Sequence, residues 1–224
     1  MSTKDEIIRN IVHTMSYTDL DLLPDYQNSI SGYTKNGLYF AVWDHRTEML
    51  VEAAMSNPSI KILLIQRGNL WEFGAIFDEE NGKLYILMSQ DNLDNKRKDY
   101  EKTGKSTHYL YSLLHYNLDK NVGEQMELFD SPDNEEDRIA DCEKMLGEYA
   151  DKVNEVIVAS FTYVNHIASK ALLNVFDGNY NQISITDISD MLIADNTTAS
   201  SNTLGNGKRD NNQDEKPLVK LLEK

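Results

Sequence analysis

Two adjacent residues, Asp44 and His45, are the first pair in this sequence that could carry out acid–base chemistry. A carboxylate beside an imidazole at the end of a strand can serve as a general base. The pair follows residues 38–43, whose aromatic content predicts a strand, and precedes a helix predicted over residues 46–55. A structural role is the alternative, because Asp44 suits a helix N-cap and His45 then belongs to the first turn.

Together with Glu72, this pair suggests an enzyme. The hypothesis is a divergent metal-dependent nuclease whose candidate catalytic residues are Asp44, His45 and Glu72. Nuclease cores that hold Mg²⁺ use two carboxylates and a lysine in a Glu-x-Lys pattern. Here Glu72 is followed by Phe73 and Gly74, so that pattern is absent. The enzyme hypothesis is therefore an alternative to roles in protein binding.

No metal site and no cofactor is predicted. His108 and His115 are seven residues apart, which separates them by about 10 Å along a helix. Cys142 is the single cysteine and is predicted to be a small buried residue on a helix. The sequence contains neither a run of about 18 apolar residues nor a signal-peptide core, so we expect a cytoplasmic protein.

The net charge is −15, from 37 acidic and 22 basic residues, so direct binding to nucleic acid is not expected. Residues 117–151 hold twelve acidic and three basic residues, a net charge of −9. They form either a solvated acidic loop and helix face or a surface that attracts a basic partner. The predicted acidic surface comprises Glu124, Glu127, Asp130, Asp133, Glu135, Glu136 and Asp137.

Within residues 117–134, predicted to be an exposed linker, two large apolar residues stand side by side in QMELF. The pentapeptide resembles the bacterial sliding-clamp-binding motif, whose common form is Gln-Leu-(Ser/Asp)-Leu-Phe. That resemblance implies that Gln125 bonds at the rim of the clamp groove and that Leu128 and Phe129 fill its apolar subsite. Met126 and Glu127 depart from the common form. The alternative is that Leu128 and Phe129 pack against the protein's own domain.

An α+β fold is predicted, with an antiparallel sheet packed against N-terminal and central helices. Residues 60–90 predict a three-stranded meander, because β-rich segments alternate with Arg-Gly-Asn and Asn-Gly turns. Residues 153–186 predict a second set of strands. A helix capped by Thr3 with Glu6, and a turn at Pro24, are predicted near the N-terminus.

Residues 1–192 are predicted to form a single domain, followed by a disordered tail over residues 193–224. The tail ends in PLVKLLEK, a small apolar patch that is either a second linear motif or frayed.

The combined pattern of WDHR, LWEFGAIFD, GKLY, HYLYSLL and the Leu-Phe linker is similar to an uncharacterised family of low-GC Gram-positive bacteria and their prophages. The similarity covers about residues 4–192 and implies a setting in mobile DNA, without a known activity. Three functions remain open. The first is an interaction protein that docks on a sliding clamp or related nucleic-acid machinery. The others are a DNA-mimicking inhibitor of a restriction or CRISPR effector, and the nuclease. The oligomeric state is left open.

Overall fold

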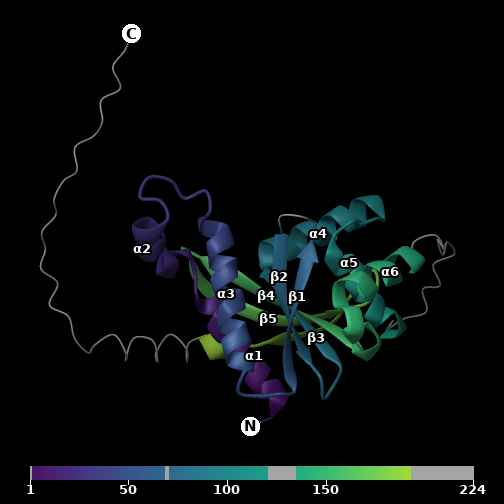
Figure 1. Cartoon of the computed structure of the whole chain (residues 1–224). Helices are drawn as coiled ribbons and strands as arrows, with labels where there is room; N and C mark the ends of the chain where they lie inside the picture. Colours follow the sequence, from purple (N-terminus) through teal and green to yellow (C-terminus); the bar gives the residue numbers. More distant parts are fainter. Residues whose placement is uncertain (1, 69–70, 121–134, 193–224) are drawn as a thin grey trace, which may run out of the picture.

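The structure, a computed structural model, describes residues 2–68, 71–120 and 135–192. Its centre is a six-stranded sheet whose strands follow one another in chain order. Helices cover both faces, so the predicted α+β class is confirmed (Figure 1). The strands are β1 (Ile60–Arg67), β2 (Trp71–Asp78), β3 (Lys83–Ser89), β4 (Glu155–Val164), β5 (Ile167–Phe176) and β6 (Gln182–Asp187).

Two antiparallel meanders meet at one parallel pair. Strands β1 to β3 form the first meander and β4 to β6 the second, and both were predicted. Strands β3 and β4 run parallel, with Ser89 opposite Phe161 at their carboxyl ends. A parallel pair requires a crossover, and the whole central helical region makes this one. The carboxyl ends of two adjacent strands therefore open at the same edge of the sheet.

One face of the sheet is covered by α1 (Thr3–Ser16) and α3 (Leu38–Ala54). Side chains alternate along a strand, so Tyr85 and Leu87 of β3 point toward these helices. Gly74 of β2 allows α3 to lie close to the sheet, because a Cβ there would come within 3.2 Å of Thr47 Cγ2. Helix α2 (Asp19–Ser29) packs against the outer side of α3 (Figure 1).

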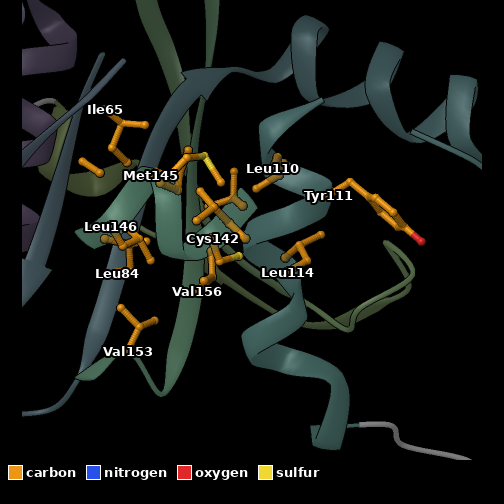
Figure 2. Packing of buried hydrophobic residues seen from close by; sticks show 14 of the residues in the cluster. Ile65, Leu84, Leu110, Tyr111, Leu114, Cys142, Met145, Leu146, Val153 and Val156 are labelled. Carbon is orange, nitrogen blue, oxygen red and sulfur yellow. The ribbon is translucent and has the colours of Figure 1, made fainter. Parts of the chain in front are cut away.

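The opposite face carries the crossover helices and the larger apolar cluster. Figure 2 shows Leu110, Leu114, Cys142 and Met145 packed among these elements. Cys142 is 1% exposed on α6, so its predicted role as a small buried residue is confirmed. The elements are α4 (Gln90–Thr103), α5 (Tyr109–Leu113), the 3-10 helix η1 (Leu114–Lys120), α6 (Glu135–Leu146) and the 3-10 helix η3 (Gly147–Lys152).

The strand predicted over residues 38–43 is wrong, because those residues form the first turns of α3. Leu38, Val42, Arg46 and Leu50 are buried at a spacing of four, which is helical. Of the aromatic residues that suggested a strand, Tyr39 and Phe40 are exposed on this helix and Trp43 is half-buried. Asp44 consequently lies inside α3 and is not its N-cap.

The two predictions near the N-terminus are also corrected. Helix α1 is capped one residue earlier than predicted, since Ser2 Oγ accepts from the Asp5 backbone N–H and Asp5 accepts from Ser2 in return. Pro24 does not make a turn but lies within α2, which tolerates the lost backbone donor. Asp21 stabilises the start of α2 by accepting from the backbone N–H and the hydroxyl of Thr18.

The first four residues of the predicted linker are helical instead. Residues 117–120 belong to η1, and Asn117 is fully buried, where its side chain donates to the Val156 and Phe176 carbonyls. Residues 121–134 and 193–224 lie outside the described residues, and with them QMELF and the predicted tail.

Candidate functional site

The three candidate catalytic residues do not come together. Asp44 and His45 line a groove between α2 and α3, whereas Glu72 lies on β2 and is not among its lining residues. His45 stacks on Tyr17 with ring centroids 4.4 Å apart, and its Nδ1 is 3.8 Å from a Glu48 carboxylate oxygen. The nuclease hypothesis therefore lacks a shared cleft for its three residues.

The residues predicted for partner binding are mostly outside the described chain. This holds for Gln125, Met126, Leu128 and Phe129, and for the acidic residues Glu124, Glu127, Asp130 and Asp133. The remaining acids occupy the first turn of α6, where Glu136 and Asp137 are exposed. Glu135 is half-buried and forms ion pairs with His115 and Arg138.

A different cleft, of about 480 Å³, opens at the carboxyl ends of the parallel strands. Ser89 ends β3 and Tyr163 lies near the end of β4, and both line this cleft. The start of α2, the loop before α3 and the first turns of α3 form the other walls. Ligands of open sheets tend to bind beyond the carboxyl ends of parallel strands, where neighbouring connections diverge.

Arg46 of α3 occupies the floor of this cleft and is only 6% exposed. Its Nε donates to the Tyr17 carbonyl at 3.0 Å, and Nη2 donates to the same oxygen at 2.6 Å. Nη2 also donates to the Met15 carbonyl at 3.3 Å and the Tyr163 hydroxyl at 3.1 Å. The guanidinium carbon lies 5.0 Å from the Trp43 ring centroid and 5.6 Å from that of Tyr163.

The charge of Arg46 is not balanced by an acid. No carboxylate forms an ion pair with Arg46 within the described part of the chain, and its Nη1 has no hydrogen-bond acceptor there. A buried cation whose neighbours are neutral oxygens and aromatic rings retains a positive potential. The floor of the cleft is therefore suited to an anion.

A histidine and an aspartate meet at the mouth of the cleft. His166 Nδ1 lies 2.7 Å from Asp19 Oδ1, although the two residues are 147 positions apart in the sequence. Asn165 and His166 form the two-residue turn between β4 and β5, with φ values of 50° and 66°. Glycine is favoured at the second position of such a turn, so a histidine there holds a strained backbone.

Lys35 and three aromatic side chains complete the cleft. Lys35 is exposed in the loop before α3, and its carbonyl accepts from the Leu38 backbone N–H. Tyr39, Trp43 and Tyr163 provide flat walls. Burial raises the pKa of Tyr163, whose hydroxyl donates to the Met15 carbonyl at 2.9 Å, so this phenol stays neutral at physiological pH.

Two sequence patterns contain residues of this cleft. Arg46 belongs to the WDHR motif, and Asn165-His166 was predicted as a turn, a prediction that is confirmed. Neither pattern indicated that Arg46 is buried or that His166 meets Asp19. Both facts depend on contacts between distant segments, which local spacing does not encode.

Two negative findings complete the description. Within residues 2–68, 71–120 and 135–192, no three His, Cys, Asp or Glu side chains gather as ligands of a metal ion would. None of the helices described is both long and apolar enough to cross a membrane.

Fold and cleft together define an α+β protein in which a buried arginine, without a carboxylate partner among the described residues, faces a cleft with aromatic walls. The chain matches, over residues 1–224, the model of a family described as a family of unknown function, DUF5986, and it belongs to that family. No curated protein and no solved structure matches the chain.

Proposed function

We propose that this protein binds a small anionic ligand carrying a flat ring, such as a nucleotide, in the cleft around Arg46. The observation that carries the proposal is that Arg46, a residue only 6% exposed, has no carboxylate partner among the described residues. Burying an unbalanced charge costs several kcal/mol unless other charges or dipoles compensate. A ligand phosphate or carboxylate would supply the compensation.

Local charge makes this cleft distinct from the rest of the molecule. Arg46 and Lys35 contribute two positive charges, and Asp19, already hydrogen-bonded to His166, contributes one negative charge. The chain as a whole carries −15. An anion would be repelled from most of the surface and attracted here, which is the electrostatic focusing expected of a binding site.

The size and walls of the cleft indicate the rest of the ligand. A volume of about 480 Å³ falls within the range of small-molecule sites. Tyr39, Trp43 and Tyr163 offer ring faces on which a planar group can stack. A phosphate near Arg46 and Lys35, with a base against these rings, satisfies both the charge and the shape.

Fluorescence of Trp43 provides the test. Replacing Trp71→Phe leaves Trp43 as the sole tryptophan, and the chain is then titrated with ADP, with adenosine and with pyrophosphate. We expect ADP to quench Trp43 most tightly, because adenosine lacks the charge and pyrophosphate lacks the ring.

Lysine variants sharpen this test. Lys35→Glu should weaken ADP binding by about tenfold, while the matched reversal Lys144→Glu, at an exposed site on α6, should leave it unchanged. Equal affinity for ADP and adenosine, or equal effects of the two reversals, would contradict the proposal.

The second candidate function is docking on a bacterial sliding clamp through QMELF. Its support is the match at Gln125, Leu128 and Phe129. The described elements on either side, η1 and α6, are each held in the core, by Asn117 and by Cys142. Such a chain would bring the anion-binding cleft to the replication machinery of a low-GC Gram-positive host, through a short linear motif.

Co-elution with purified bacterial clamp tests this second function. The double variant Leu128→Ala, Phe129→Ala should abolish co-elution, because it removes both apolar anchors. Met126→Leu restores the common motif and should tighten binding. Unchanged co-elution of the double variant would exclude the motif as the docking element.

A further inference from the structure

A second hollow, the acidic groove, lies on the outer side of α3 and is separate from the Arg46 cleft. It has a volume of about 710 Å³ and runs between α2, α3 and the edge strand β1. Its walls combine apolar side chains with four carboxylates, and none of the described residues that line it is a lysine or an arginine. The carboxylates belong to Asp25, Asp44, Glu48 and Glu52.

Large apolar side chains in this groove are exposed to solvent. Ile30 after α2 is 67% exposed, Met55 after α3 is 79% exposed, and Leu64 of β1 is 62% exposed. A neighbouring hollow of about 490 Å³ shares Met55 and Leu64 and continues the apolar surface over β1. A contiguous apolar surface assembled from three elements indicates a docking site.

The carboxylates of the groove are also mostly without cationic partners. In the described residues, ion pairing within the groove is limited to Glu48 and His45, whose facing atoms are 3.8 Å apart. The groove therefore favours an occupant that is apolar on one side and carries positive charge.

We propose that residues 216–224 of this chain, KPLVKLLEK, dock in the acidic groove. Leu218, Leu221 and Leu222 have the spacing that places them on one side of a helix, where they would cover Ile30, Met55 and Leu64. Three lysines and one glutamate give the segment a net charge of +2. The lysines would lie at the mouth of the groove, within about 8 Å of its carboxylates, where salt screening is incomplete.

The connecting chain is long enough. The last described residue, Leu192, packs in the apolar cluster that lies between the sheet and the helices α1 and α3. Residues 193–215 connect Leu192 to the segment, and 23 residues can span at most about 75–80 Å when fully extended, which exceeds the dimensions of the groove. The terminal segment therefore reaches the groove at a high effective concentration, without a second molecule.

Disulfide trapping in the full chain tests the proposal. Ser29→Cys lines the groove and Val219→Cys lies in the segment, and neither change removes a groove carboxylate or one of the three leucines. The native Cys142 stays out of the reaction, because burial raises the pKa of its thiol to about 12. The control pairs Val219→Cys with Arg9→Cys, an exposed site on α1 of the same face.

We expect the Ser29 pair to form an intramolecular disulfide at least about ten times faster than the Arg9 pair, because docking raises the effective concentration. Adding Glu48→Lys and Glu52→Lys should remove most of that advantage. Equal rates for the two pairs would overturn the proposal. Disulfide-linked dimers alone would also overturn it and would assign the groove to a second copy of the chain.

Discussion

Two buried arginines, one on each face of the sheet, show how the same residue type can have different roles. Arg138 of α6 is 5% exposed and Arg46 of α3 is 6% exposed. Both donate to backbone carbonyls from distant segments, and both lie near an aromatic ring, Tyr111 in one case and Trp43 in the other. Among the described residues, Arg138 has an acid beside it, Glu135 at 3.6 Å, and Arg46 has none.

This difference in ion pairing separates an arginine with a structural role from one that is available to a ligand. Arg138 joins α6 to the Tyr111 and Gly178 carbonyls in the interior of the larger cluster, and its charge is balanced there. Arg46 also donates to two backbone carbonyls, but it faces a cleft. No carboxylate of the described residues pairs with its charge, so an anionic ligand could do so. We infer that Arg138 serves the fold and that Arg46 serves both the fold and a ligand.

The largest expected effect comes from removing Arg138. Arg138→Ala deletes hydrogen bonds to two buried carbonyls and leaves the half-buried Glu135 with His115 alone. Unfolding in urea should show a loss of about 3 kcal/mol in the free energy of unfolding. A loss below about 1 kcal/mol would show that the arginine is dispensable to the fold.

Removing Arg46 should cost less stability and abolish binding. Arg46→Met retains most of the apolar volume and strands no carboxylate, and Tyr163 continues to donate to the Met15 carbonyl. The free energy of unfolding should fall by about 2 kcal/mol. ADP quenching of Trp43 should disappear in this variant and persist in Arg138→Lys. Retained ADP binding by Arg46→Met would break the distinction between the two arginines.

Acid should affect the face that carries Arg138 through His108. Burial, with Lys96 and Arg67 nearby, lowers the pKa of His108 to about 4. The unfolded chain, whose histidine pKa is about 6.5, then binds the proton more readily, so stability is complete above pH 6.5 and is lost as the pH falls toward 4.

The matched variant for this titration is His108→Asn, which keeps a side-chain acceptor for the Leu110 backbone N–H. Between pH 7 and pH 4.5 the wild type should lose about 2 kcal/mol more than the variant, after allowance for the partial exposure of His108. Parallel stability curves would show that His108 titrates normally.

The smallest effect is expected at the mouth of the cleft. His166→Gly relieves a positive φ of 66° and removes the contact with Asp19. The free energy of unfolding should stay level or rise by up to about 1 kcal/mol, while ADP affinity falls. Asn165→Gly is the control, since it eases the same turn without touching Asp19. A clear loss of stability in His166→Gly would assign this histidine to the fold alone.

Much of the sheet could be predicted from the sequence, and the cleft could not. The turns at Gly68, at Gly82 and at Asn165-His166 separate apolar segments rich in strand-forming residues, so the two meanders could be predicted. The beginning of α3 was misread because residues 38–43 combine β-type aromatic content with a burial period of four. Packing against the sheet decides whether these residues form a strand or a helix.

The residues that meet at the cleft illustrate the same limit. An Asp-His pair was sought at Asp44-His45, where the two are neighbours in sequence. The pair that lies at a cleft mouth beside a buried cation is Asp19 with His166. Their proximity follows from the parallel joining of β3 and β4, which brings the β4–β5 turn next to the start of α2.

The sequence by itself determined the strands, the N-terminal helix and the burial of Cys142, since each depends on residues within a few positions of one another. The tertiary structure alone decided that Arg46 is buried with no carboxylate partner in the part of the chain that the structure describes, that Asp19 meets His166, and that four carboxylates line an apolar groove. Burial and charge balance are properties of surroundings assembled from distant segments. For that reason the strands could be read from the chain, whereas the two candidate binding sites required the fold.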